Sequence, residues 1–272
     1  MKKAQMSFLE VSHLTVRSAD GDALVDDVSF SVDAGERVGL IGESGSGKSV
    51  TSLAVTGLLD AGLIASGSVL LDGQQVVGAS DRMLRPLRGP AASIVFQEPL
   101  TALDPLMRVG KQVAEPIARH RKLRGAELRG AVHDALVDVA LPDERFARAF
   151  PHELSGGQRQ RVAIAIALAA QPRLLIADEP TTALDVTVQN EILDLLDRLV
   201  AEHDMALLFI SHDLAVVSRM VQRVVVLQDG VAVESGPVND VITAPQHEYT
   251  QKLVASARAL DSTLDGVTHE PP

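Results

Sequence analysis

Residues 42–49 read Gly-Glu-Ser-Gly-Ser-Gly-Lys-Ser, and this stretch decides the fold. It follows the apolar run Val38–Ile41 and precedes Val50–Leu59, which is expected to be helical. Glycines at these positions let backbone N–H groups turn inward around a β-phosphate, and a helix N-terminus adds partial positive charge. Lys48 would reach the β- and γ-phosphates, and the Ser49 hydroxyl would ligate Mg²⁺. The context favours a P-loop NTPase core over the alternative, a flexible Gly/Ser turn.

Short apolar runs elsewhere are typical of strands buried on both faces of a parallel sheet. They are Val38–Ile41, Leu174–Ala177, Ala206–Ile210 and Val224–Leu227, and helical segments separate them. Before the loop, apolar and polar residues alternate from Phe8 to Val16 and from Val28 to Val32, as in an antiparallel sheet with one solvated face. We therefore expect an α/β fold with a parallel sheet and an N-terminal antiparallel β subdomain.

One part of the chain lacks strand patterns. The stretch from Asp104 to Phe150 is rich in Arg, Ala and Leu, and its amphipathic spacing predicts helices. We expect a helical insert at about residues 104–165, within a single domain at residues 7–256. After Ser256 the periodicity is lost, so residues 257–272 are expected to form a mobile C-terminal tail.

Composition excludes several kinds of site and partner. The chain has 272 residues, of which 46% are hydrophobic and 22% charged, as in ordinary soluble globular proteins. It has no cysteine, which excludes disulfides, thiolate zinc sites and cysteine-held iron–sulfur clusters. The net charge of −11 argues against nucleic acid as a partner. The longest apolar run, Val162–Ala170, is shorter than the about 20 residues of a bilayer span, so we expect membrane association only through a partner protein.

Two acids, Asp178 and Glu179, end the apolar run Leu174–Ala177. Ligands of parallel α/β sheets gather at the carboxyl ends of the strands, where the phosphate loop also lies. Asp178 would hold Mg²⁺ through its water shell, because a hard cation prefers oxygen ligands. Glu179 points the other way along the pleat and would polarise the attacking water. On its own such a pair could also be an acidic turn at a strand end.

A second glycine-rich helix start lies at Leu154–Arg161, which reads Leu-Ser-Gly-Gly-Gln-Arg-Gln-Arg. Ser155 is a natural N-cap, and glycines beside a helix start present backbone donors to an anion. One nucleotide site needs only one such helix start, so the simplest resolution is a dimer in which each of these stretches serves the partner's ATP. Taken alone, the stretch would equally well cap a core helix.

This string resembles the signature of ATP-binding cassette (ABC) ATPases, and further elements of that family follow in order over about residues 7–255. The resemblance implies that Gln97 contacts Mg²⁺ and the lytic water and senses the helical insert. It implies that Ala183-Leu184-Asp185 is the D-loop at the dimer interface. It also implies that His212 is the switch histidine that holds the γ-phosphate and water. Taken singly, Gln97 and His212 would be ordinary polar residues at strand ends.

The residues and the resemblance together assign the site, with ATP and Mg²⁺ as cofactors. The expected catalytic residues are Glu179, His212 and Gln97, and the expected Mg²⁺ ligands are Ser49, Gln97 and Asp178. The expected nucleotide contacts are Arg17, Gly42, Glu43, Ser44, Gly45, Ser46, Gly47, Lys48, Ser49 and Val50, and from the partner chain Ser155, Gly156, Gly157, Gln158 and Asp185. Arg17 is included because the family stacks an aromatic residue on adenine near the end of the first strand, where Val16–Asp20 has none. A guanidinium plane could stack instead.

Three strings resemble one subfamily, the ATPases of dipeptide, oligopeptide and nickel importers. They are Phe96–Pro105, Phe150–Leu154 and Pro245–Thr250, the last with Glu248 where the subfamily's P-x-H-P-Y-T element has its second proline. The resemblance implies that ATP-driven dimer closure is coupled to uptake of peptides, with nickel or a metal chelate as the alternative cargo.

The same resemblance implies a set of partners and a location. The partners are a second ATPase chain (identical or not), two transmembrane permease subunits and, indirectly, an extracellular solute-binding protein. The location is the cytoplasmic face of the cell membrane, reached through the permeases. A soluble ABC protein of DNA repair or translation fits less well, because this cassette is uninterrupted and the chain is acidic.

Overall fold

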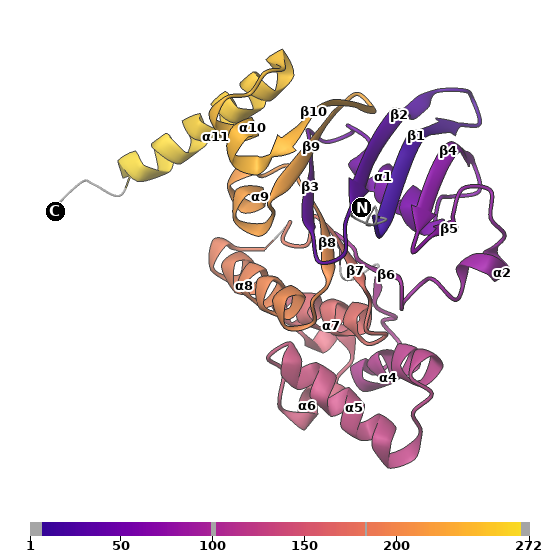
Figure 1. Cartoon of the computed structure of the whole chain (residues 1–272). Helices are drawn as coiled ribbons and strands as arrows, with labels where there is room; N and C mark the ends of the chain where they lie inside the picture. The colour runs from indigo at the N-terminus through magenta and orange to yellow at the C-terminus, as the bar shows by residue number, and fades with distance from the viewer. Residues whose placement is uncertain (1–6, 99–101, 183, 268–272) are drawn as a thin grey trace, which may run out of the picture.

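The structure, a computed structural model, describes residues 7–98, 102–182 and 184–267, with side chains as far as residue 258. Figure 1 shows a central sheet, an antiparallel sheet to one side of it and a group of helices below. This arrangement confirms the predicted α/β class with a parallel sheet and an N-terminal antiparallel sheet. Among the described helices, none is both long and apolar enough to cross a membrane.

The central sheet has the strand order β10-β9-β3-β8-β7-β6. Its strands are β3 (Arg37–Ile41), β6 (Ala92–Val95), β7 (Leu174–Asp178), β8 (Ala206–Ser211), β9 (Arg223–Gln228) and β10 (Val231–Pro237). All of these strands except β10 run parallel to one another, and β10 pairs antiparallel with β9. Ile41 of β3 pairs with Ser211 of β8, and Asp178 of β7 pairs with Ile210 of β8. The carboxyl ends of β3, β8 and β7 therefore lie level with one another.

The antiparallel sheet has the order β2-β1-β4-β5. Its strands are β1 (Leu9–Ser18), β2 (Ala23–Val32), β4 (Leu63–Leu71) and β5 (Gln74–Gln75). Helix α1 (Lys48–Thr56) contacts strands of both sheets, so it lies between them. It begins two residues before the expected Val50–Leu59. It also ends earlier, because Gly57 adopts φ 65° and caps the helix with backbone N–H bonds to the last turn.

The central sheet separates two apolar cores, as the period of two along each strand requires. In β8, Leu208 and Ile210 belong to the core that contains α1 and the antiparallel sheet. Leu207 and Phe209 belong to the core on the other face, which the helices that follow β6 in the chain cover. Burial on both faces explains why these strands have continuous apolar runs in the sequence.

The predicted insert consists of helices. They are α4 (Val109–His120), α5 (Gly125–Asp138), α6 (Glu144–Arg148) and the 3-10 turn Pro151–Glu153, followed by α7 (Gly156–Leu168). We call α4, α5 and α6 the helical body. Helix α7 contacts α4 and α5 on one side and β6 and α8 (Val186–Glu202) on the other. It therefore joins the helical body to the central sheet.

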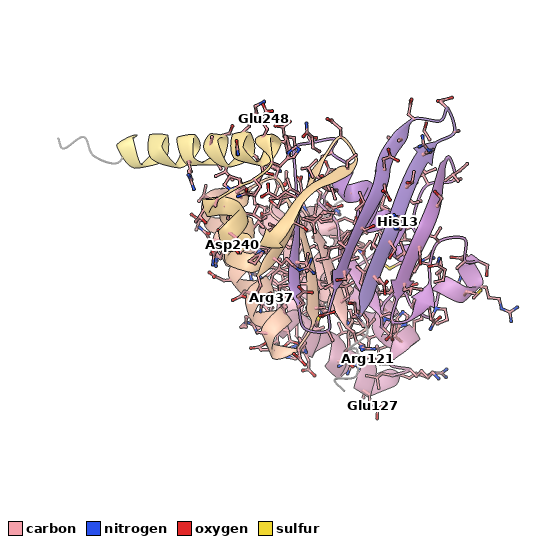
Figure 2. All side chains as sticks on the ribbon, turned by 45° about the horizontal axis from the view of Figure 1, so that its top comes forward. His13, Arg37, Arg121, Glu127, Asp240 and Glu248 are labelled. Atoms are coloured by element: carbon pink, nitrogen blue, oxygen red, sulfur yellow. The ribbon has the colours of Figure 1, made fainter. Side chains whose placement is uncertain are left out.

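The remaining helices are α2 (Asp81–Leu84), α9 (Leu214–Met220), α10 (Val238–Thr243) and α11 (Glu248–Val267). Residues 257–267, which we expected to belong to a mobile tail without periodicity, are helical and continue α11. The signal that was missed is the stripe Tyr249, Leu253 and Ala257, spaced one helical turn apart and packed against the core. Figure 2 shows α11 leaving the body of the molecule from its start at Glu248.

Candidate functional site

The phosphate loop joins the carboxyl end of β3 to the start of α1. Gly42 and Gly47 have φ values of 154° and 95°, which favour glycine over other residues. A Cβ on Gly42 would lie 2.2 Å from the Leu227 carbonyl oxygen, and one on Gly47 would lie 2.7 Å from the Leu24 carbonyl oxygen. Neighbouring backbone on two sides therefore allows only glycine at these positions, and the loop is held tightly around its centre.

Lys48 lies inside this loop, with only 5% of the residue exposed. Its Nζ donates hydrogen bonds to the carbonyl oxygens of Gly42 at 2.8 Å and Glu43 at 2.7 Å. Burial lowers the pKa of Lys48, and the neighbouring carboxylates of Glu179 and Asp178 oppose that shift. A phosphate at the loop would give this buried ammonium a charged acceptor, which neutral carbonyls do not supply.

Asp178 lies on the same face of β7 as Leu174 and Ile176, which is the face toward α1. Its carboxylate is buried and accepts hydrogen bonds from the hydroxyls of Ser49 at 3.1 Å and Ser52 at 3.3 Å. Burial raises the pKa of Asp178, and the two serine donors counteract part of that shift. A hydroxyl and a buried carboxylate side by side are the oxygen ligands that Mg²⁺ prefers, and a divalent cation would offset the desolvation of the acid. The residues therefore fit Mg²⁺.

Glu179 and its side-chain partners come from three separate segments of the chain. Its Oε2 accepts hydrogen bonds from Gln97 Nε2 at 3.3 Å and Thr182 Oγ1 at 2.9 Å, and its Oε1 lies 3.2 Å from His212 Nδ1. Gln97 follows β6 and His212 follows β8, the two neighbours of β7 in the sheet. The sheet order therefore assembles the predicted catalytic group of Glu179, Gln97 and His212.

The backbone of Glu179 has φ 46°, a conformation that costs a residue other than glycine about 1 kcal/mol or more. Its N–H donates to the Ile210 carbonyl oxygen at 2.9 Å, which holds the turn in place. The side chain is 13% exposed, whereas that of His212 is 57% exposed. The acid is thus fixed at the edge of the site, with one face open to a water molecule or substrate.

Sequence reasoning did not identify two hydroxyl residues that hold these acids. Ser52 lies one helical turn after Ser49 on α1, and Thr182 lies three residues after Glu179. The spacing of Ser49 and Ser52 was a visible signal, because residues three apart share a helix face. Thr182 sits in a turn, so no periodicity pointed to it.

A cavity of about 710 Å³ contains the loop and the catalytic group. Its lining includes Lys48, Glu179 and His212, together with Leu253 and Ser256 of α11. Arg17, expected to stack on adenine, does not line this cavity. Its guanidinium instead donates to the Gly21 carbonyl oxygen at 3.2 Å and lies 3.8 Å from the Asp26 carboxylate of β2. These contacts keep Arg17 on the β1–β2 hairpin.

The second glycine-rich helix start is well formed but does not line the cavity. The Ser155 hydroxyl accepts from the Gln158 N–H at 3.3 Å, and the Gln158 side chain accepts from the Ser155 N–H at 3.0 Å. A Cβ on Gly157 would lie 2.6 Å from Cγ1 of Val188 on α8, so glycine permits close contact between α7 and α8. No residue of the Ser155–Gln158 stretch lines the cavity that contains the phosphate loop of its own chain.

The expected D-loop leads into α8 at the same place. Asp185 caps α8 by accepting from the Val188 N–H at 3.0 Å, and it does not line the cavity either. Leu184 lies 3.5 Å from where a Cβ on Gly156 would be, which places it beside the second helix start. Ala183, the first residue of the expected D-loop, lies outside the described residues.

Comparison with known proteins places these features in a family. A model of the ABC transporter family matches residues 25–182, more than half of the chain. The peptidoglycan transport ATP-binding protein YejF of Agrobacterium fabrum is 48% identical over 91% of this chain. A putative peptide import ATP-binding protein of Brucella ovis, BOV_A0348, is 48% identical over 89%, and the oligopeptide transport ATP-binding protein OppD of Bacillus subtilis is 44% identical over 90%. The chain spans 46%, 74% and 70% of these three proteins, respectively.

Solved structures of cassettes are similar as well. The dimeric ATP-binding cassette MJ0796 bound to ADP and Pi has a TM-score of 0.74 and is 31% identical, over 85% of this chain and 98% of that one. The cbiO1 protein of Clostridium perfringens, part of the ABC transporter complex cbiONQ, has a TM-score of 0.77 and is 28% identical, over 95% of this chain and 99% of that one. The family match includes both the phosphate loop and the acidic pair at the end of β7. The chain therefore belongs to the ABC transporter family and carries its ATPase domain.

Proposed function

We propose that this chain, with residues 7–256 as a single ATPase domain, is the ATP-hydrolysing subunit of a peptide importer. The observation that carries the hydrolytic part is the Glu179 carboxylate, bonded by Gln97, Thr182 and His212 in the cavity that contains Lys48. Two relatives support peptides as the cargo: a putative peptide import ATP-binding protein and an oligopeptide transport ATP-binding protein, which are 48% and 44% identical to this chain. Nickel or a metal chelate remains the alternative cargo.

In the proposed reaction each group has one task. Lys48 and the loop N–H groups bind the phosphates of ATP, and Ser49 and Asp178 hold Mg²⁺, with Gln97 as the third expected ligand. Bound Mg²⁺ would neutralise phosphate charge. Glu179 accepts a proton from the attacking water, and its donors fix which carboxylate oxygen faces that water. His212, which lines the same cavity, holds the γ-phosphate and the water in this proposal.

The second glycine-rich helix start supports a dimer. Ser155, Gly156, Gly157 and Gln158 are absent from the lining of their own chain's cavity, yet Ser155 and Gln158 form a complete capping box at a helix start. Such a helix start favours an anion. We propose that it meets the γ-phosphate held by a partner ATPase chain, together with the partner-facing Asp185. ATP would then favour the closed dimer, and hydrolysis would release it.

The helical body is the proposed docking site for two permease subunits at the cytoplasmic face of a membrane. A groove of about 530 Å³ lies between α4, α5 and α6, lined by apolar residues such as Val132 and Leu136 and by charged ones such as Arg129. A groove of this mixed character suits an amphipathic helix of a partner. Helix α7 contacts both the helical body and β6, and Gln97, two residues after β6, donates to Glu179, so movement of the body would reach the catalytic group.

Removal of Mg²⁺ tests the metal assignment. Chelation by EDTA is expected to abolish ATP hydrolysis, and excess Mg²⁺ is expected to restore it, because the phosphate charge is otherwise uncompensated. Asp178→Asn should raise the Mg²⁺ concentration for half-maximal hydrolysis by about tenfold or more. Asp240→Asn on α10 provides a control with the same loss of charge. Hydrolysis that continues at full rate in EDTA would contradict the assignment.

Purification from the native membrane tests the transport function. The chain is expected to co-purify with two permease subunits, and peptide-loaded solute-binding protein is expected to stimulate hydrolysis by the reconstituted complex. Steady-state phosphate release measures the stimulation. Stimulation by a nickel chelate but not by peptide would favour the alternative cargo, and the absence of permeases from the purified complex would contradict the importer function.

A further inference from the structure

The phosphate loop also contacts the C-terminal helix α11. The hydroxyl of Tyr249, in the first turn of α11, accepts a hydrogen bond from the Glu43 N–H at 2.8 Å. The carbonyl oxygen of the same residue accepts from Lys48 Nζ at 2.7 Å. The backbone of Glu43 is therefore held on both of its polar groups, from the C-terminal helix and from inside the loop.

Tyr249 is itself firmly placed. Glu234 of β10 accepts hydrogen bonds from the N–H groups of Gln246 at 2.9 Å and His247 at 3.0 Å, which fixes the chain just before α11. Burial raises the pKa of Glu234, but these backbone donors, together with the neighbouring Thr250 and His247 side chains, outweigh it and the net shift is downward. Thr250 is fully buried beside Tyr249, so the first turn of α11 has little freedom to move.

The same helix reaches further into the nucleotide cavity. Leu253 and Ser256 lie one and two turns after Tyr249, and both line the cavity together with Lys48. Residues at this spacing share one face of a helix. One face of α11 therefore both supports the loop through Tyr249 and forms a wall of the cavity.

Binding of ATP changes how Glu43 is held. When Lys48 turns its ammonium to the phosphates, it gives up at least part of its bonds to the loop carbonyls, because charged oxygens are the stronger acceptors. Two supports of the Glu43 backbone then remain: the Tyr249 hydroxyl on its N–H, and the Ser46 N–H, which donates to its carbonyl oxygen at 3.2 Å. The contribution of the Tyr249 hydroxyl is consequently larger in the ATP-bound state than in the free state, and only such a difference alters affinity.

We propose that Tyr249 is a positioning residue of the ATP site, which keeps the phosphate loop in its binding geometry through the Glu43 N–H and so makes α11 part of that site. The proposal rests on the assignment of residues 42–49 to ATP. It gives the C-terminal helix a role in nucleotide affinity and not only in packing. Tyr249 acts through the loop backbone and takes no part in the chemical step.

Tyr249→Phe is the direct test, because it removes the hydroxyl and keeps the ring that packs on the core. The Kd for the non-hydrolysable analogue AMP-PNP and the KM for ATP are each expected to rise about three- to tenfold, as for the loss of one hydrogen bond. The kcat should stay within about twofold of the parent value, because the acid and its donors are untouched. Titration calorimetry and steady-state phosphate release measure these quantities.

The control is Ser218→Ala on α9, which removes an exposed hydroxyl that donates to the Ala215 carbonyl oxygen at 2.8 Å, away from the loop. It should leave Kd, KM and kcat unchanged. If Tyr249→Phe lowers only the melting temperature and leaves Kd and KM as in the parent, Tyr249 is structural and the proposal is overturned. If the parent chain itself does not bind AMP-PNP, the assignment of the loop to ATP is overturned first.

Discussion

Glu179→Gln is expected to slow ATP hydrolysis by a factor of about 10² to 10⁴, the usual contribution of a general base, while ATP still binds. The amide keeps the shape of the acid, so the hydrogen bonds from Gln97 and Thr182 to the side-chain oxygen persist. Its NH₂ group then faces His212, whose Nδ1 accepts from it in the tautomer that carries the proton on Nε2. The binding groups of the loop are unchanged. The carboxamide cannot take a proton from water.

Steady-state phosphate release measures the loss, and equilibrium titration with AMP-PNP measures binding. Glu202→Gln is the matched control, because Glu202 is an exposed acid that pairs with Arg198 on α8 at 2.7 Å, remote from the cavity. The control should hydrolyse ATP at the parent rate. An unchanged rate for Glu179→Gln would show that another group activates the water.

Ser155→Arg is expected to reduce hydrolysis by about 10²-fold, as when preorganised donors to a transition state are lost, without weakening ATP binding to a single chain. Ser155 is not in the cavity of its own chain, so the loop keeps its contacts. In the proposed dimer the bulky side chain would instead block the partner's γ-phosphate. Phosphate release and AMP-PNP titration again separate the two effects.

Ser155→Arg also removes the N-cap of α7, and this effect must be distinguished from blocking of the partner's γ-phosphate. Asp143→Ala removes the N-cap of α6, which accepts from the Arg145 N–H at 2.8 Å, and should cost about 1 kcal/mol of stability with little change in hydrolysis. A mixture of Ser155→Arg and Glu179→Gln chains is the sharper control. Each mixed dimer contains one intact composite site, so equal amounts should regain about a quarter of the parent rate if two copies pair symmetrically.

The mixture has a clear negative outcome. If neither variant restores the other, two copies of this chain do not share sites, and the partner ATPase must be a different chain. If Ser155→Arg alone abolishes AMP-PNP binding to an isolated chain, the second helix start acts within its own chain, and the proposed dimer is contradicted.

The catalytic group was predictable because it depends on local patterns. The phosphate loop has fixed glycine positions between a strand and a helix, and the Asp178–Glu179 pair ends a strand whose burial leaves a continuous apolar run. Parallel strands bring their carboxyl ends to one edge of a sheet, so the loop and the acidic pair were expected together. Gln97 and His212 were assigned through the resemblance to the ABC family. The structure brings Gln97, Glu179 and His212 within hydrogen-bond distance at that edge.

Other parts of the site have no local signal. Arg17 was assigned to adenine because an aromatic residue is missing nearby, but the Asp26 carboxylate on the paired strand β2 draws its guanidinium away. For Arg17, a tertiary contact outweighed the local pattern. The helix after Ser256 was missed because the packed stripe of Tyr249, Leu253 and Ala257 stops there. Beyond that stripe, the end of a helix and an irregular tail look alike in the sequence.

The sequence by itself determined the fold class, the phosphate loop and the carboxylates, since each follows from strand burial, glycine geometry and the order of a few short motifs. Only the tertiary structure decided which side chains support them. Thr182 holds Glu179, Ser52 holds Asp178, and Tyr249 reaches Glu43 across 206 residues of chain. The last two bonds join residues far apart in the chain, so their formation depends on how whole helices and strands pack. Thr182 lies in a turn, where no periodicity indicates which residue its hydroxyl will contact.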